Sequence, residues 1–264
     1  MTRQSTKIAP KPNTYAQLGP VYDEIWPVYE KSWVRNREKL LRSILPGVKS
    51  VCELGCGSGT AAIDFARRGL KVYAVDLSPE MCRVTRGKVR ETGLPVRVWR
   101  ADMRTFRLPE PVDLVCSQWG VINHLPNRSQ LAQVARAVAR ALRPGGYFYF
   151  DLHQRLLYEG HWSITNYGEG PNFFAVEHGG FDRKRRKGWN RVTWFIRSRK
   201  GVWERHDDLL EEIEWPHADI IRHLRQAGLE LVRVLDFSDL AAPPSTRRVS
   251  TGLRTMYLAR KKGK

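Results

Sequence analysis

Short apolar runs alternate with amphipathic stretches between residues 50 and 152. The apolar runs have the length of strands and read VKSVCELG, LKVYAVD, LPVRVWRAD, VDLVCSQWG and GGYFYFDLH. The stretches between them have helical spacing, as in TAAIDFARRG, PEMCRVTRGKVRETG and SQLAQVARAVARAL. Strand, helix and strand in repetition predict a parallel sheet wrapped by helices, and continuous apolar strands indicate a sheet that is buried on both faces.

Flanking segments extend this pattern at both ends. Before residue 50, apolar side chains recur at roughly helical spacing and predict one or two helices that lean on the sheet, with a break at Pro27. These side chains are Ile25, Tyr29, Trp33, Leu40 and Leu41. Near the C-terminus, PHADIIRHLRQAGL predicts a helix, and LELVRVLDF and TGLRTMYLARK predict two closing strands.

Between residues 154 and 215 the apolar pattern changes to a period of two. The runs FFAVEHGGF, NRVTWFIRS and VWERHDDLLEEIEW are separated by glycine-bearing turns, which is typical of antiparallel hairpins. We therefore predict an α/β fold with a doubly wound, seven-stranded, mostly parallel Rossmann-like sheet. Residues 1–45 form an N-terminal tail and helical lid, residues 46–153 and 216–264 form the sheet domain, and residues 154–215 form an antiparallel β insertion.

Charge raises the question of an acidic partner. The chain of 264 residues carries a formal net charge of +18, and such a potential attracts phosphates and anionic surfaces. The run from Arg183 to Lys187, next to Trp189, Trp194 and Phe195, would suit RNA phosphates with base stacking. We favour a hairpin tip whose strand aromatics face the core, because turns concentrate charge and strand aromatics usually pack.

Cysteine spacing and hydropathy narrow the chemistry further. The four cysteines never form the C-x-x-C pairs of a zinc or redox site, so we expect small buried hydrophobes and neither a metal nor a disulfide. The N-terminal stretch is polar and broken by prolines, and no run approaches the ~18 to 20 apolar residues that span a bilayer. These features predict a soluble cytoplasmic protein without a membrane partner.

A glycine-rich stretch, VCELGCGSGT, follows the first predicted strand. Glycines at this position let the backbone turn sharply and let a ligand lie against main-chain atoms. The spacing is G-x-G-x-G, and the chain has no G-K-[ST], so neither the dinucleotide fingerprint nor the phosphate loop is matched. The second strand ends in Asp76, 21 positions after Gly55 (76 minus 55), where a carboxylate can accept hydrogen bonds from ribose hydroxyls. Asp102 follows the third strand, so the pattern predicts a nucleoside site without pyrophosphate.

Five segments in this order and spacing resemble the successive motifs of class I S-adenosylmethionine-dependent methyltransferases. They are ELGCGSGT, AVDLSPEM, ADMRTF, DLVCSQWGVINHL and LRPGGYFYFDLH, and the resemblance covers about residues 50 to 152. It implies S-adenosylmethionine as cofactor, S-adenosylhomocysteine as product, and no metal. It also implies a cofactor site of Glu53, Gly55, Cys56, Gly57 and Gly59 along the methionine part, Asp76 at the ribose, Leu77, Met81, Asp102 and Met103 around the adenine, and Gln118 nearby.

Methyl transfer from a sulfonium is an in-line displacement, for which the protein mainly has to align the reactants and exclude water. An amine acceptor needs at most the loss of a proton, which a nearby His, carboxylate or Tyr can take. Candidate side chains follow the fourth and fifth strands or come from the lid. We expect Tyr22 and His124 to be catalytic, although His124 could instead cap the next helix or lie in solvent. Candidates for acceptor binding are Tyr15, Trp119, Asn123 and His153.

The segment Y-x-x-x-x-P-x-Y-D, which begins at Tyr15, resembles the N-terminal lid of small-molecule methyltransferases that modify amino groups. Those enzymes, including the amino-sugar and glycine types, also carry antiparallel hairpins after the fifth strand. The resemblance implies an N-methyltransferase with a small-molecule acceptor, as a monomer or as a homodimer through the insertion. Two alternatives stay open: a tRNA or rRNA methyltransferase that uses the basic hairpin 181–200, and a non-catalytic module that binds S-adenosylmethionine.

Overall fold

Two β-sheets build the molecule. The computed structural model describes residues 15, 18–19, 21–25, 37–198, 200–236 and 252–263. The larger sheet has seven strands in the order β10-β11-β5-β4-β1-β2-β3. Its strands are β1 Ser50–Leu54, β2 Lys71–Asp76, β3 Val96–Arg100, β4 Val112–Ser117, β5 Leu142–His153, β10 Leu229–Asp236 and β11 Arg254–Lys261. Strand β11 runs opposite to the other six strands, so the predicted mostly parallel α/β sheet is confirmed.

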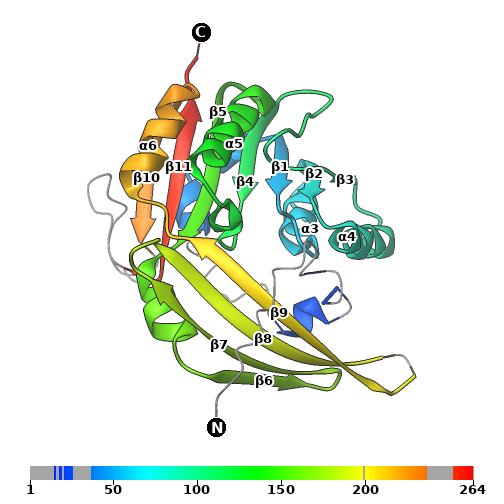
Figure 1. Cartoon of the computed structure of the whole chain (residues 1–264). Helices are drawn as coiled ribbons and strands as arrows, with labels where there is room; N and C mark the ends of the chain where they lie inside the picture. Colours follow the sequence, from blue (N-terminus) through cyan, green and yellow to red (C-terminus); the bar gives the residue numbers. More distant parts are fainter. Residues whose placement is uncertain are drawn as a thin grey trace.

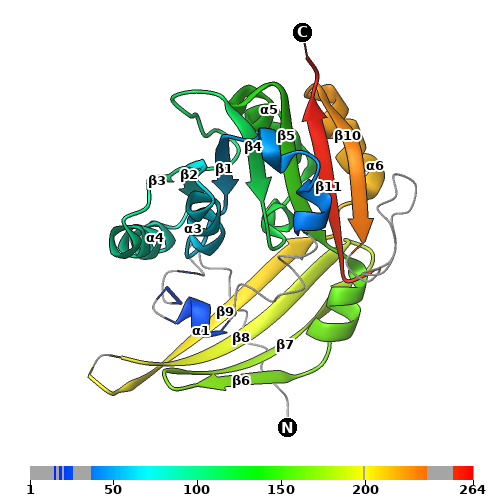
Figure 2. The same cartoon turned by 180° about the vertical axis from the view of Figure 1, so that it is seen from behind.

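Helices cover both faces of the seven-stranded sheet. Helices α5 (Arg128–Ala141) and α6 (His217–Gln226) pack on one face, and α3 (Thr60–Arg67) packs on the other together with the helical turns of residues 37–47 (Figures 1 and 2). The strand side chains alternate between two separate apolar clusters, one on each face. Helix α4 (Pro79–Thr92) contacts β2 and β3 at the edge of the sheet. Both faces are therefore buried, as the continuous apolar strands predict.

Local signals explain where the helices begin. The Asn127 side chain accepts a hydrogen bond from the Gln130 N–H at 3.0 Å and starts α5, and Ser78 caps α4 in the same way. These caps satisfy backbone donors that have no partner within the helix. Because Asn127 supplies the cap of α5, His124 does not serve that purpose.

A second, four-stranded antiparallel sheet lies across the carboxyl ends of the parallel strands (Figure 1). Its strands are β6 Asn166–Gly170, β7 Phe173–Asp182, β8 Lys187–Arg197 and β9 Trp203–Ile213, and the π-helix η3 (Leu157–Trp162) precedes them. Trp194 is 2% exposed and packs in an apolar cluster with Val21 of the N-terminal segment. Trp189 and Phe195 lie on the opposite face and are half-buried. The expectation that all three aromatics face the core is therefore right only for Trp194.

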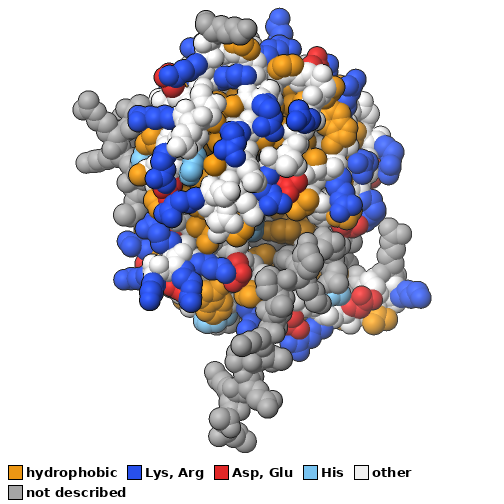
Figure 3. All heavy atoms as spheres, turned by 45° about the horizontal axis from the view of Figure 1, so that its top comes forward, with side chains coloured by type: hydrophobic (Ala, Val, Ile, Leu, Met, Phe, Trp, Pro, Cys, Tyr) orange, Lys and Arg blue, Asp and Glu red, His pale blue; other side chains and the backbone are white. Residues whose placement is uncertain are grey.

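The basic run forms the tip of the hairpin between β7 and β8. Its residues pair with nearby carboxylates: Arg183 with Glu159, Arg185 with Asp182, Arg186 with Glu214, and Lys187 with Glu211, at 2.6 to 2.9 Å. Elsewhere, Lys and Arg side chains are scattered over the face seen in Figure 3 rather than gathered in one patch. The tip is therefore a self-neutralised turn, which weakens the case for an RNA-binding hairpin.

The N-terminal segment reaches the edge of the larger sheet. Within its described residues, α1 (Tyr22–Ile25) lies between the four-stranded sheet and the loop after β1 (Figure 1). Asp23 accepts a hydrogen bond from Ser58 Oγ at 2.5 Å and forms an ion pair with Lys88 of α4. Leu40 and Leu41 are fully buried, whereas Pro27, Tyr29 and Trp33 lie outside the described residues. Part of the predicted lid thus contacts the glycine loop, and the proposed domain boundaries remain a prediction.

Candidate active site

A cavity of about 740 Å³ opens at the carboxyl ends of β1, β2, β3 and β4. Ligands of open α/β sheets bind at this edge, and the volume lies within the range of small-molecule sites. The cavity brings together most of the residues that the sequence predicts for the site: Glu53, Gly55, Cys56, Gly57, Asp76, Leu77, Met81, Asp102, Met103, Gln118, Tyr15, Tyr22, Trp119 and His124.

Three predicted residues do not line the cavity: Asn123, His153 and Gly59. Gly59 belongs to the glycine loop. Its φ angle is +78°, and a Cβ atom there would lie 2.4 Å from Thr85 Cγ2 of α4. Gly59 thus allows the close packing of the loop against α4, and its contact with the cofactor stays a prediction. Gly55, by contrast, lines the cavity with φ at +66°, where a Cβ atom would collide with Val121. Both positions need glycine because side chains disfavour this backbone conformation.

Asp76 joins the glycine loop to the end of β2. Its two carboxylate oxygens accept the N–H groups of Gly57 and Ser78, each at 2.8 Å. Burial raises the pKa of Asp76, although these hydrogen bonds to the charged form counteract the rise. The carboxylate therefore fixes the loop and still faces the cavity. Each oxygen has lone pairs left that could accept ribose hydroxyls.

Asp102 and Glu53 have contrasting environments. Hydrogen bonds from the Arg104 side chain hold the pKa of Asp102 below its usual value, so this carboxylate is ionised. Burial raises the pKa of Glu53 to about 8, although Arg37 attracts the charged form. Glu53 is 4% exposed and accepts a hydrogen bond from Gln118 Nε2 at 3.2 Å. At neutral pH it is mostly protonated and can offer a hydrogen-bond donor at the base of the glycine loop.

Tyr15, Tyr22 and His124 line the same cavity, with Tyr22 next to the glycine loop. The Tyr15 hydroxyl lies 3.3 Å from His124 Nε2, and the Tyr15 ring meets the rings of Tyr22 and His124 edge-on. His124 ends the short 3₁₀ helix η2 (Val121–His124) and has a side chain that is 32% exposed. Burial raises the pKa of Tyr15 and of Tyr22, so both tyrosines keep their protons at neutral pH. His124 is therefore the group among these three that can take up a proton.

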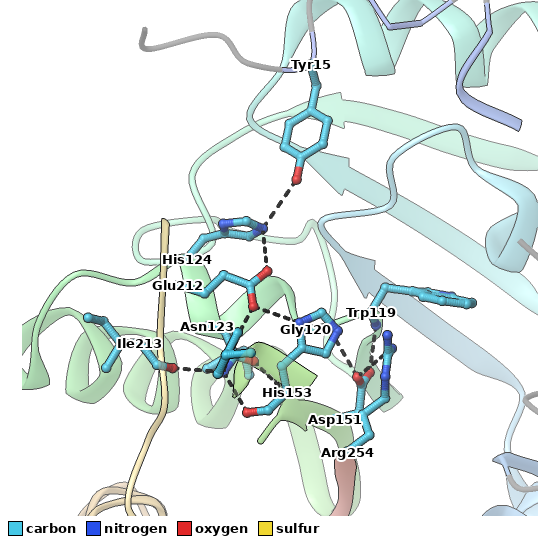
Figure 4. Close-up of polar contacts among 12 residues, drawn as sticks. Tyr15, Trp119, Gly120, Asn123, His124, Asp151, His153, Glu212, Ile213 and Arg254 are labelled. Carbon is cyan, nitrogen blue, oxygen red and sulfur yellow. Dashed lines mark hydrogen bonds and ion pairs between the residues drawn. The ribbon is translucent and has the colours of Figure 1, made fainter. Parts of the chain in front are cut away.

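Next to His124 lies a buried polar network, shown in Figure 4. Glu212 of β9 accepts hydrogen bonds from His153 Nδ1 at 2.7 Å and from the Tyr158 hydroxyl at 2.9 Å, and its other oxygen lies 3.6 Å from His124 Nε2. Asn123 is fully buried and donates its amide hydrogens to the carbonyl of His153, the carbonyl of Ile213 and Tyr158.

This network holds two of the predicted residues and adds two others. Asn123 and His153 do not line the cavity, and their contact with the acceptor stays a prediction. Sequence reasoning missed Glu212 and Tyr158. No local motif marks either residue, and only the packing of the second sheet brings Glu212 to His124 and to Tyr158.

A strained turn places Trp119 in the cavity wall. Trp119 and Gly120 both have positive φ, at 65° and 67°. Asp151, which is fully buried, accepts their N–H groups at 2.7 and 3.0 Å, and the Arg254 guanidinium stacks 4.6 Å from the centre of the Trp119 ring. A non-glycine residue in this conformation is costly and is often found at functional sites. Asp151 thus supports the turn from behind.

The described residues show no metal-binding cluster, no disulfide and no helix that could span a membrane. Among the described residues, no group of three or more His, Cys, Asp or Glu side chains is placed to hold a metal ion. The four cysteines are free and buried, as the sequence predicts. Within the same part of the chain, the helices are too short or too polar to cross a bilayer.

Comparisons with known proteins agree with this geometry. Residues 51–146 match a family model described as a methyltransferase domain. A protein of Geobacillus sp. (strain WCH70) with a methyltransferase name is 23% identical over 227 residues, which cover 81% of this chain and 87% of that protein.

Two solved structures share the fold. An S-adenosylmethionine-dependent methyltransferase from Clostridium acetobutylicum ATCC 824 has a TM-score of 0.77 at 21% identity, covering 95% of this chain and all of that one. The sugar N-methyltransferase KedS8 from Streptoalloteichus sp. ATCC 53650 has a TM-score of 0.69 at 23% identity, covering 99% of both chains. With the matched domain and the cavity at the sheet edge, these likenesses support a class I S-adenosylmethionine-dependent methyltransferase.

Proposed function

We propose that this enzyme transfers the methyl group of S-adenosylmethionine to the nitrogen of a small-molecule amine. The observation that carries the proposal is the contact of Tyr15 with His124 in the lining of the cavity that also holds the glycine loop. This part of the lining offers a group that can accept a proton, and it offers two neutral hydroxyls that can orient an acceptor.

The residues around the cavity fit the cofactor. Asp76 would hold the ribose hydroxyls, Leu77 and Asp102 would flank the adenine, and the methionine part would lie along Gly55 and Gly57, which line the cavity. When bound there, S-adenosylmethionine supplies a methyl group activated by a sulfonium. Tyr22 lies beside this loop, since a Cβ atom on Gly57 would be 3.7 Å from its hydroxyl oxygen.

An amine reaches the site largely as an ammonium ion, which has no lone pair for attack. Tyr15 is protonated before the reaction and can relay a proton. Its hydroxyl gives its proton to unprotonated His124 Nε2, and its oxygen takes up a proton from the ammonium nitrogen. The freed lone pair then forms the N–C bond as the C–S bond breaks, which leaves a thioether and the methylated ammonium. The proton ends on His124 and returns to solvent after product release.

A small acceptor suits the size and the lining of the cavity. The cavity has a volume of about 740 Å³, and Tyr15, Tyr22 and Trp119 give its lining an aromatic surface. The fold that this chain shares with the sugar N-methyltransferase includes its full length. These points support a compact amine, such as an amino sugar, over a polymer.

A labelled-methyl assay tests the proposal. The enzyme is incubated with methyl-labelled cofactor and a panel of small amines, the matched hydroxyl compounds, and total RNA. We expect label on an amine nitrogen, and we expect kcat to fall about 100-fold in both Tyr15→Phe and His124→Gln, a typical size for a general-base contribution. Arg128→Gln, which alters a distant ion pair with Asp219, is the matched control and should keep wild-type kcat. Label on hydroxyls or RNA alone would contradict the proposal.

A further inference from the structure

Glu212 is an ionised carboxylate buried beside the proposed active site, and it takes no part in the proton relay through Tyr15 and His124. Its side chain is 5% exposed. Burial alone would raise the pKa of Glu212, but the attraction of His153 and His124 and the hydrogen bonds from His153 and Tyr158 hold it below its usual value. A charge kept this far from solvent needs compensating partners, and such groups cluster at functional sites.

The packing of the four-stranded sheet against η3 fixes the position of the Glu212 carboxylate. Glu212 stands opposite Gly188 of β8, where a Cβ atom would lie 2.3 Å from the Tyr158 ring. The glycine therefore leaves room for Tyr158, whose hydroxyl donates to Glu212 Oε2. His153 donates to the same oxygen, so Oε1 is left to face His124 at 3.6 Å (Figure 4).

We propose that Glu212 is a positioning residue for methyl transfer: it stabilises the positive charge that the His124 ring gains from the acceptor amine. The inference rests on the proposed function, because it assigns a role in the same proton transfer. It makes the antiparallel sheet part of the catalytic apparatus and not only a cover for the acceptor.

The arrangement explains how one nitrogen serves two partners. Unprotonated Nε2 accepts the Tyr15 hydroxyl hydrogen, and protonated Nε2 has a carboxylate within ion-pair distance. An opposite charge at such a distance favours the charged form of the ring. Other titratable or charged groups interact with the pair or with its partners: Tyr15, Tyr22 of α1, Asp76 of β2, His153 of β5, Tyr158 of η3, Asp208 of β9, Glu214, and Arg254 of β11.

Two variants of β9 test the inference. Glu212→Gln keeps the shape and the acceptor for Tyr158 but removes the charge. Glu211→Gln is the matched control, because Glu211 is the adjacent residue, is half-exposed and pairs with Lys187 on the other side of the strand. The first readout needs no methyl acceptor. In ¹⁵N-histidine spectra, with the signal assigned by its loss in His124→Gln, the His124 ring signals should change in Glu212→Gln and stay as in wild type in Glu211→Gln.

The second readout uses the amine that the labelled-methyl assay identifies. In Glu212→Gln, kcat should fall about 10- to 100-fold with unchanged KM for the cofactor, whereas Glu211→Gln should keep the wild-type kcat. His124 ring signals in Glu212→Gln that match those of the wild type would overturn the inference. Failure to methylate any amine would overturn the proposed function instead, because the NMR readout does not depend on turnover. If Glu212→Gln does not fold, Glu212→Asp should give a smaller change in the same signals, and no change would again overturn the inference.

Discussion

The substitution Asp76→Asn separates cofactor binding from folding. In the wild type, both carboxylate oxygens accept backbone N–H groups at 2.8 Å and face the cavity. Asparagine keeps one acceptor oxygen and turns an NH₂ group toward the other side, so the proposed ribose hydroxyls lose a charged acceptor. A hydrogen bond to a charged group contributes about 1.5–3 kcal/mol. We therefore expect a loss of about 3 kcal/mol in binding, which is roughly a 100-fold rise in Kd.

The apo protein should tolerate the same change. Burial raises the pKa of Asp76, so the charge that Asn removes is one whose burial costs stability at pH 7. One backbone N–H loses its acceptor, which costs about 1 kcal/mol in the opposite direction. The free energy of unfolding should therefore change by less than about 1 kcal/mol. Titration calorimetry with S-adenosylhomocysteine measures the binding, and denaturant melts measure the folding.

Asp102→Asn is the matched control for that experiment. Its carboxylate is already engaged by Arg104, so the proposed adenine edge loses about one modest hydrogen bond. We expect a rise in Kd of about fivefold, near 1 kcal/mol. An unchanged Kd in Asp76→Asn, with the fold intact, would refute the ribose assignment.

Three further predictions concern stability and the lid. The pKa of Glu53 is raised to about 8, so its contribution to stability is complete below its ordinary pKa near 4.5 and is lost as pH rises to about 8. The wild type should therefore lose stability relative to Glu53→Gln by about 1 kcal/mol per pH unit in that window, which denaturant melts at pH 5 to 8 would measure. Gly59→Ala should lower the free energy of unfolding by about 3 kcal/mol, because it adds backbone strain and overlaps with α4. Gly69 also has positive φ but has open space around it, so Gly69→Ala should cost about 1 kcal/mol, and equal costs would contradict the packing role of Gly59. Lys88→Met removes the ion pair that joins α1 to α4 and should speed cofactor dissociation about two- to fivefold in stopped-flow, whereas Arg83→Gln on the same helix should not.

The cofactor side of the site follows from the sequence because parallel strands align their ends. Leu54 of β1 pairs with Val75 of β2, and Asp76 pairs with Arg100 of β3. Residues that follow these positions must meet at one sheet edge, whatever the details of packing. That geometric rule is why Gly55, Gly57 and Asp76 could be predicted to lie together from their spacing alone.

The acceptor side depends on contacts that no local pattern encodes. Glu212 of β9 and His124 of η2 lie 88 positions apart (212 minus 124) and meet only because the second sheet crosses the strand ends. Asn123 adjoins a predicted strand-end loop, yet its amide turns inward to the His153 and Ile213 carbonyls. Polar side chains near a site are thus predictable, but the direction in which each one points is not.

The aromatic hairpin shows the same limit. A period of two predicts a strand with two distinct faces, but Trp189, Trp194 and Phe195 include residues of both parities. Only Trp194 has its indole N–H satisfied by a buried carboxylate, Asp208, at 3.1 Å, and lies in the apolar cluster with the N-terminal segment. Which parity faces inward depends on what the sheet packs against.

A crystal structure of the complex with S-adenosylhomocysteine tests the central assignment most directly. The account predicts ribose hydroxyls on Asp76, the adenine between Leu77 and Asp102, and the sulfur facing the gap between the glycine loop and the Tyr15 hydroxyl. An adenosyl group bound elsewhere, or a sulfur turned away from Tyr15 and His124, would contradict it.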